Sequence, residues 1–106
     1  MNVRHLRYFI VAAEEGNFRR AALRLDTRQS NVSRYVRMIE HELGADLFHR
    51  KPGHDARLTE VGRAFLDDVR EMFERFDRAK LAAQSVAVGC QGRLRLAASE
   101  DVMTGT

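Results

Sequence analysis

The sequence predicts a mainly α-helical fold, in which three short helices and a small β-hairpin precede one long helix. Three apolar patterns of helical period fall within the first 44 residues. A segment that holds the only proline then separates two short apolar runs, as a hairpin turn does. From Thr59 onward, apolar side chains recur at spacings of three and four over about 25 residues, which is a heptad seam. The 106 residues leave room for one small domain and an appendage.

Two short helices are expected at the start of the chain. Asn2 can cap a first helix that runs to about Glu15, where Gly16-Asn17 ends it. A second helix is expected from about Phe18 to Leu25. Both have an apolar face with the spacing i, i+3, i+4, i+7, made of Leu6, Phe9, Ile10 and Ala13 in the first and of Phe18, Ala21, Ala22 and Leu25 in the second. The two alanines are small, so another helix can approach closely there.

The third helix is expected to have one apolar side and one polar side. It runs from about Arg28 to Leu43, with Thr27 as its cap and Gly44 as its stop. Its apolar stripe consists of Val32, Val36, Ile39 and Leu43. The opposite side is polar and consists of Ser30, Ser33, Arg34, Arg37 and His41. Such a helix can bury one edge and present the other to base edges and phosphates.

The second and third helices are joined by only three residues, Asp26-Thr27-Arg28, of which Asp tolerates turn conformations. Two helices joined this closely, the second with a polar outer face, describe a helix-turn-helix at about residues 18–37. A generic three-helix bundle would share the same apolar spacing and stays open as an alternative at this point.

A basic hairpin is expected after the third helix. Leu47-Phe48 is its first strand and Ala56-Arg57-Leu58 its second, and the segment between them, residues 50–55, is rich in charge. A basic hairpin after a helix-turn-helix is a wing, whose tip can reach phosphates or a minor groove. A solvated surface loop is the alternative. The whole arrangement predicts a winged helix-turn-helix.

A long helix is expected from Glu60 to Val88, with Thr59 as its N-cap. Its seam consists of Val61, Phe65, Val69, Met72, Phe76, Ala79, Ala83 and Val86, with Leu66 and Phe73 beside it. So small a domain cannot bury this seam, which implies a partner helix and predicts a dimerisation helix. Packing within the monomer is the alternative. Gly89-Cys90-Gln91-Gly92 is expected to break the helix, and the residues from Arg93 to Ala97 alternate like a strand.

Positive charge is concentrated in the N-terminal part. Residues 1–59 carry eleven Lys and Arg against seven Asp and Glu, a net charge of +4, whereas residues 60–106 have a net charge of −1. This distribution indicates an anionic partner. A single cysteine, no apolar run of membrane-spanning length and no signal peptide predict a cytoplasmic protein without membrane contact.

An enzyme is the rival class. His41, His49 and His54 have carboxylates nearby, but no ligand spacing such as HExxH occurs. A glycine-rich phosphate loop is also absent from the sequence. No catalytic residue, metal or cofactor is therefore predicted.

Five motifs occur in order along the chain. They are Leu6-Arg7-Tyr8-Phe9 in the first helix, residues 17–25 in the second, Gln29-Ser30-Asn31-Val32-Ser33-Arg34 in the third, residues 42–50 with Leu58-Thr59-Glu60-Val61-Gly62 around the wing, and Gly92-Arg93-Leu94-Arg95-Leu96 near the end. At these spacings, residues 1 to about 97 resemble the N-terminal part of LysR-type transcriptional regulators.

The resemblance implies a dimeric, cytoplasmic bacterial regulator of transcription that binds interrupted palindromes in double-stranded DNA. It implies a DNA-binding domain in residues 1–59, a linker and dimerisation helix in 60–88, and a hinge with the first strand of a truncated effector-binding domain in 89–106. The site for a small-molecule effector is then absent from this sequence. A homodimer, or a higher oligomer built on it, is expected. The alternative function is a truncated regulator that inhibits full-length relatives by dimerising with them.

Particular residues are expected to contact DNA or a second copy. The base-contacting candidates are Gln29, Ser30, Ser33 and Arg34, because Gln can read adenine and Arg can read guanine in a bidentate manner. The candidates for the DNA backbone and the wing are Arg28, Arg37, Arg50, Lys51 and His54. The dimerisation candidates are Val61, Phe65, Val69, Met72, Phe76, Ala79 and Ala83.

Overall fold

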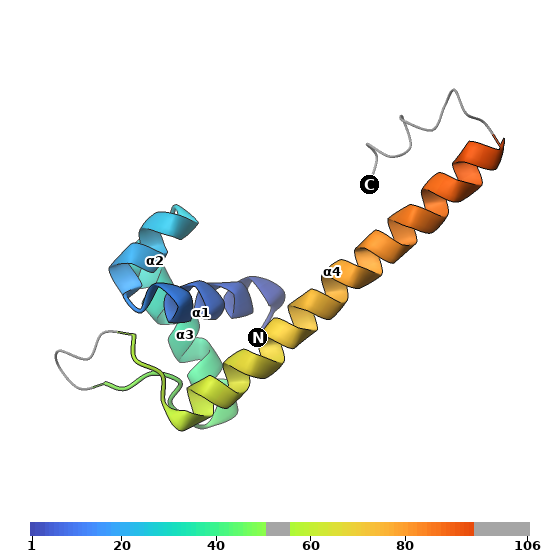
Figure 1. The fold of residues 1–106 in the computed structure, drawn as a ribbon. Coiled ribbons are helices and arrows are strands. Elements are labelled where there is room, and N and C mark those ends of the chain that lie inside the picture. The colour runs from blue at the N-terminus through green and yellow to red at the C-terminus, as the bar shows by residue number, and fades with distance from the viewer. Residues whose placement is uncertain (51–55, 95–106) are drawn as a thin grey trace. The chain divides into compact units, whose positions relative to one another are not determined.

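The computed structural model describes residues 1–50 and 56–94, which form four helices (Figure 1). These are α1 (Val3–Glu15), α2 (Phe18–Leu25), α3 (Gln29–Leu43) and α4 (Glu60–Leu94). Residues Met1–Arg70 form one compact unit, in which α1, α2 and α3 all contact one another, and the chain from Glu71 onward forms a second unit. The predicted mainly α-helical fold is confirmed.

Local capping explains where α1 and α2 begin and end. The side chain of Asn2 accepts a hydrogen bond of 3.1 Å from the backbone N–H of His5, and Asn17 accepts one of 2.9 Å from Arg20. Between the two helices, Gly16 has a φ of 67°, in the left-handed region that favours glycine. The predicted bounds of both helices are confirmed.

The turn between α2 and α3 depends on Asp26, which ends α2 with a φ of 56°. Asp tolerates this left-handed conformation better than most side chains. The predicted cap of α3 is wrong: Arg28 occupies the N-cap position and makes no side-chain capping bond. The Thr27 hydroxyl instead accepts a hydrogen bond of 2.9 Å from the side-chain amide of Asn31.

The core lies where the three helices meet the chain after α3. Phe9 is fully buried, and its ring lies 5.6 Å from that of Phe48 and 5.5 Å from that of Phe65. In α2, Ala21 and Ala22 are buried, and their small side chains allow a neighbouring helix to approach closely. From α3, the buried apolar residues are Val32, Val36 and Ile39.

Two predicted apolar faces need correction. In α1, Val11 and Ala12 are buried, whereas Ile10 and Ala13 are only half-buried. α1 contacts both α2 and α3, and its Phe9 also meets Phe65 of α4, so its buried surface extends beyond the predicted stripe to Val11 and Ala12. In α3, Leu43 is 40% exposed, because it is the last helical residue before the chain turns at Gly44.

The two predicted strands of the hairpin do pair, although only briefly. Phe48 and Leu58 form an antiparallel bridge. Beside it, the N–H of His49 donates to the carbonyl of Arg57 at 2.8 Å, and that of Thr59 donates to the carbonyl of Leu47 at 2.9 Å. The described part of the hairpin is therefore its base.

Thr59 begins α4 and ties it to the domain. Its hydroxyl accepts a hydrogen bond of 3.0 Å from the N–H of Gly62 and donates one of 2.6 Å to the carbonyl of Asp46. The predicted N-cap is confirmed. One turn later, Gly62 lies so close to the chain that a Cβ atom there would come within 2.1 Å of the Leu47 carbonyl oxygen. The first turn of α4 thus requires glycine at this position.

Ion pairs join α1 to α2 and to the first turns of α4. Arg24 of α2 lies 2.8 Å from the Glu14 carboxylate and 3.2 Å from that of Glu15, and Arg70 lies 3.3 Å from Glu14. Hydrogen bonds to Glu14 and then to Glu15 raise the pKa of Arg24 above its ordinary value. These contacts are exposed, so they orient the helices more than they stabilise the fold.

The predicted break at residues 89–92 is wrong, because α4 continues through it to Leu94. Arg93 and Leu94, expected to begin a strand, are the last helical residues. Glycine in a helix costs only about 1 kcal/mol relative to alanine, and the segment contains no proline, so a helix that has already formed can continue. The rest of the predicted strand, residues 95–97, lies outside the described residues.

Candidate nucleic-acid interface

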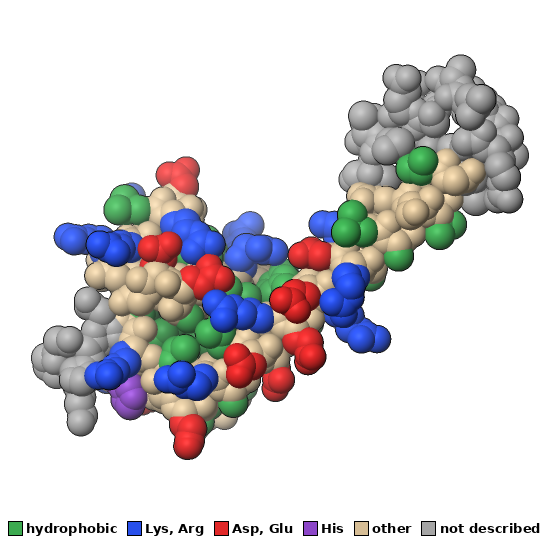
Figure 2. Space-filling view, viewed as in Figure 1, with side chains coloured by type: hydrophobic (Ala, Val, Ile, Leu, Met, Phe, Trp, Pro, Cys, Tyr) green, Lys and Arg blue, Asp and Glu red, His purple; other side chains and the backbone are tan. Residues whose placement is uncertain are grey.

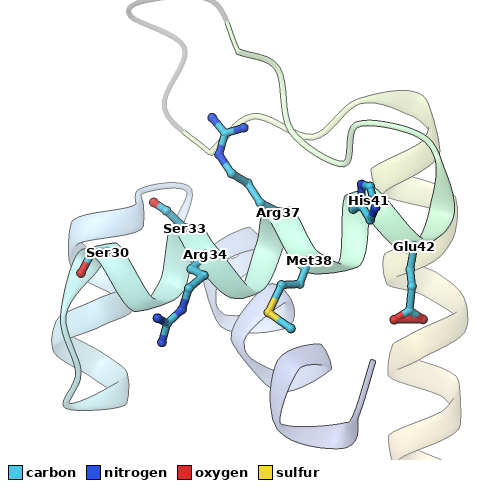
Figure 3. A pocket seen from close by; sticks show the side chains of 7 residues that line it. All are labelled: Ser30, Ser33, Arg34, Arg37, Met38, His41 and Glu42. Atoms are coloured by element: carbon cyan, nitrogen blue, oxygen red, sulfur yellow. The ribbon is translucent and has the colours of Figure 1, made fainter.

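The polar side of α3 forms an open depression on the surface (Figure 3). Its volume is about 780 Å³, and its described lining comes from α3 alone. The lining residues are Ser30, Ser33, Arg34, Arg37, Met38, His41 and Glu42. The five polar residues expected on one side of this helix are thus brought together.

The depression has two edges. In Figure 3, Ser33 and Arg37 extend from one side of α3, whereas Arg34 and Met38 extend from the other. Arg34 and Arg37 are both exposed, so their positive charges lie at the surface. Guanidinium groups in this position can donate to phosphate oxygens or to the edges of bases.

The other candidates for contact with DNA lie around the N-terminal end of α3. Gln29 and Ser30 are exposed in its first turn, and Ser33 is half-buried. Arg28 is exposed immediately before the helix. Since no side chain caps α3, the N–H groups of its first turn are not satisfied by an N-cap side chain.

Arg34 is held by its neighbours on α3. Its Nη2 donates to the Oδ1 of Asn31 at 3.1 Å, and its guanidinium carbon lies 5.3 Å from the centre of the Tyr35 ring. Arg34 was predicted from the sequence, whereas the roles of Asn31 and Tyr35 beside it were not. The spacings i, i+3 from Asn31 and i, i+1 to Tyr35 were visible in the sequence, although such spacings alone do not distinguish a contact from coincidence.

Arg50, expected to contact the DNA backbone, has a partner within the protein. Its guanidinium forms an ion pair with Glu40, a residue of α3 whose side chain is almost fully buried. Glu40 also accepts hydrogen bonds from the N–H groups of Leu47 at 2.7 Å and of Phe48 at 3.3 Å. This role of Glu40, which connects α3 to the base of the hairpin, was not predicted from the sequence. Lys51 and His54 lie outside the described residues.

The predicted dimerisation residues divide into two groups. Val69 is only 5% exposed and Phe65 is half-buried against Phe9, so both belong to the core of the first unit, together with the buried Leu66. The others are exposed, namely Val61, Met72, Phe76, Ala79 and Ala83. Figure 2 shows hydrophobic side chains at the surface along the later turns of α4.

Two further features are absent from residues 1–50 and 56–94. No group of three or more His, Cys, Asp and Glu residues there could hold a metal ion. Within the same residues, none of the helices combines the length and the apolar character needed to cross a membrane.

Comparison with known proteins gives a consistent result. The family model described as "Bacterial regulatory helix-turn-helix protein, lysR family" matches residues 3–63. The HTH-type transcriptional regulator TfdT of Cupriavidus pinatubonensis is 36% identical over 96 residues, which cover 91% of this chain and 42% of TfdT. The chain therefore spans less than half the length of this relative.

Two solved structures share the fold. The CbnR_DBD–DNA complex superposes with a TM-score of 0.76 at 37% identity, covering 82% of this chain and 99% of that one. The BenM_DBD/benA site 1 DNA complex gives a TM-score of 0.77 at 30% identity, covering 81% and 99%. Both names specify a complex with DNA.

Proposed function

Because this chain belongs to the lysR family of bacterial regulatory helix-turn-helix proteins, we propose that it binds double-stranded DNA in a sequence-specific manner and regulates transcription. The observation that carries the proposal is the exposed polar side of α3, which gathers Ser30, Ser33, Arg34 and Arg37 on one helix. An α-helix fits the major groove, where each base pair presents a distinct pattern of donors and acceptors.

The roles follow from the chemistry of each side chain. Gln29 is proposed to read adenine and Arg34 to read guanine, while Ser30 and Ser33 are small enough to let the backbone approach. Each good base contact contributes about 1–3 kcal/mol of discrimination. Arg28 and Arg37 are proposed to contact phosphates, as are Lys51 and His54. The ion pair with Glu40 supports a different role for Arg50, at the base of the hairpin.

The protein is proposed to act as a homodimer through α4. The exposed seam, with Val61, Met72 and Phe76 at its larger positions, supports a partner helix. A two-fold dimer places its recognition helices about one turn of DNA apart, near 34 Å, which suits an interrupted palindrome. Val69 contributes little to this seam, because one copy already buries it.

No catalytic residue, metal or cofactor is proposed for the chain. The protein is proposed to act on DNA in the bacterial cytoplasm. A truncated inhibitor that acts only by dimerising is not favoured, since the structural relatives include complexes with DNA.

Selection of bound sites from random DNA tests the proposal. We expect a two-fold symmetric consensus site, bound more weakly as salt rises because phosphate contacts release counterions. Arg34→Ala should lower affinity for that site about fivefold or more and change affinity for scrambled DNA little. Arg37→Ala should reduce the salt slope by about one on both DNAs. Equal losses on both DNAs for Arg34→Ala would exclude base reading by this residue, and failure to select any site would overturn the proposed function.

A further inference from the structure

We propose that Asn31 and Tyr35 are positioning residues, which hold the Arg34 guanidinium in one orientation before DNA arrives. The inference rests on the proposed function, because it explains how this arginine would discriminate between sequences. It concerns a property of the free protein as well, so it can be tested separately from DNA binding.

Asn31 fixes Arg34 through a relay of hydrogen bonds. Its Oδ1 accepts from Nη2 of Arg34 at 3.1 Å, and its Nδ2 donates to the hydroxyl of Thr27 at 2.9 Å. The bond from Arg34 defines which end of the Asn31 amide faces it, because only the oxygen can accept from a guanidinium, and Nδ2 is then left to donate to Thr27. Thr27 itself is held in the turn, where its N–H donates to the carbonyl of Ala22 at 2.9 Å. The relay thus extends from the end of α2 to the surface of α3.

Tyr35 provides the second restraint. The guanidinium carbon of Arg34 lies 5.3 Å from the centre of its ring, within the range of a cation–π contact. The ring cannot turn away easily, because His5 of α1 stacks on it at 4.4 Å with an interplanar angle of 22°, and Tyr8 meets it edge-on at 4.9 Å. Arg34 is therefore held between a fixed acceptor and a fixed ring.

These restraints leave most of the guanidinium available. An arginine has five N–H donors in a planar fork, and Asn31 accepts from one nitrogen only. A long side chain loses rotamer freedom when it binds, and a side chain that is already ordered loses less. Ordering also favours one contact geometry over others. We therefore expect the ordering of Arg34 to increase affinity for the matching site and to change affinity for scrambled DNA little.

The first experiment measures the free protein by nuclear magnetic resonance. Hindered rotation about the guanidinium bonds of Arg34 is expected in the wild type, and Asn31→Ala should make Arg34 as mobile as Arg37. Arg37 is the internal control, since it makes no hydrogen bond or ring contact with the described residues. If Arg34 already moves as freely as Arg37 in the wild type, the proposal is wrong.

The second experiment is a double-mutant cycle on the selected site and on scrambled DNA. Asn31→Ala should weaken binding to the selected site by roughly three- to tenfold in the wild type, and by less than about twofold in the Arg34→Ala background. The same loss in both backgrounds would mean that Asn31 acts directly on DNA or on the fold, and no loss in the wild type would also overturn the proposal.

Tyr35 has a conservative control. Tyr35→Phe keeps the ring and should retain selectivity, whereas Tyr35→Leu should lose it, with thermal unfolding measured for each variant to recognise a change in stability. Equal selectivity of the Leu and Phe variants would contradict a role for the ring. If the wild type selects no DNA site, the proposed function fails, and the mobility of Arg34 still decides whether the residue is positioned.

Discussion

At the scale of single residues, Glu40 is the one charged residue that is buried among the described residues. Glu40 is 7% exposed, and its carboxylate accepts hydrogen bonds from two backbone N–H groups and from Arg50. A buried charge is costly unless it is paired and hydrogen-bonded, and here both conditions hold. The carboxylate provides the acceptor that the buried backbone N–H groups of Leu47 and Phe48 would otherwise lack.

Glu40→Ala should therefore destabilise the protein by on the order of 3 kcal/mol, since it leaves buried N–H groups without an acceptor. Glu40→Gln keeps one acceptor oxygen and should cost less. Urea denaturation measures both. Glu42→Ala is the matched control on the same helix, because Glu42 is exposed and its loss should change stability by less than about 0.5 kcal/mol. Similar effects of the two alanine variants would contradict the role given to Glu40.

A sequence shows such a residue only indirectly. Glu40 follows Val36 by four positions, so it lies on the buried side of α3, and this was the available signal. Its partners lie seven to ten residues further along the chain and reach it only because the chain reverses after Gly44. In contrast, the polar positions of Arg34 and Arg37 could be predicted, because they depend only on the helical period.

At the scale of elements, the start of α4 depends on the Thr59 hydroxyl, which both caps the helix and donates to the carbonyl of Asp46. Thr59→Ala should lower stability by about 1–2 kcal/mol, as loss of a helix cap does. Thr59→Ser retains the hydroxyl and should remain close to the wild type. Thermal unfolding distinguishes the two, and equal melting temperatures for Ala and Ser would show that the hydroxyl is not needed.

Two glycines of α4 provide a matched comparison. Gly62→Ala should destabilise by about 1–3 kcal/mol through overpacking, although alanine favours helices, because the new Cβ would meet a backbone oxygen. Gly89→Ala adds the same atom where nothing lies within 4 Å, and it should stabilise by up to about 1 kcal/mol. Urea denaturation of both variants measures the difference. Stabilisation by both would contradict the close approach of α4 to Leu47.

The element bounds show which signals are local. Asn2 and Thr59 cap helices through bonds within three residues, so their roles could be predicted from short motifs. Asn17 caps α2 in the same way, although it was predicted only as part of the end of the first helix. The end of α4 could not be predicted in this way. The two glycines at positions 89 and 92 weaken a helix by an amount that the adjoining turns can offset, so their presence alone does not decide where it ends.

At the scale of the whole molecule, the exposed seam of α4 predicts self-association. Phe76→Glu should convert a dimer into a monomer at micromolar concentration, because dimerisation would then bury an unpaired carboxylate. Leu81→Glu is the control: Leu81 is 65% exposed but lies outside the seam, so the dimer should persist. Sedimentation equilibrium measures both. A wild type that is monomeric under these conditions, or a Phe76→Glu variant that stays dimeric, would contradict the predicted seam.

The helical period of the seam could be predicted from the sequence. Which of its residues pack into the first unit and which stay exposed could not. Phe65, Leu66 and Val69 pack into the first unit, whereas Met72 and Phe76 are exposed, and a heptad pattern looks the same in both cases. Which positions remain free for a partner depends on the surface that α1 and the hairpin base offer to α4. That surface exists only after the domain has folded.

The position of Gly62 has a consequence for the genetics of this protein. A collision between two side chains can be relieved by a second mutation that shortens either one. Here the colliding atom is the carbonyl oxygen of Leu47, which every amino acid possesses, and the peptide groups on both sides of Leu47 are held by Glu40 and by the N–H of Thr59. A selection for suppressors of Gly62→Ala should therefore recover reversion to glycine or changes elsewhere that stabilise the whole domain, and should not recover substitutions at position 47.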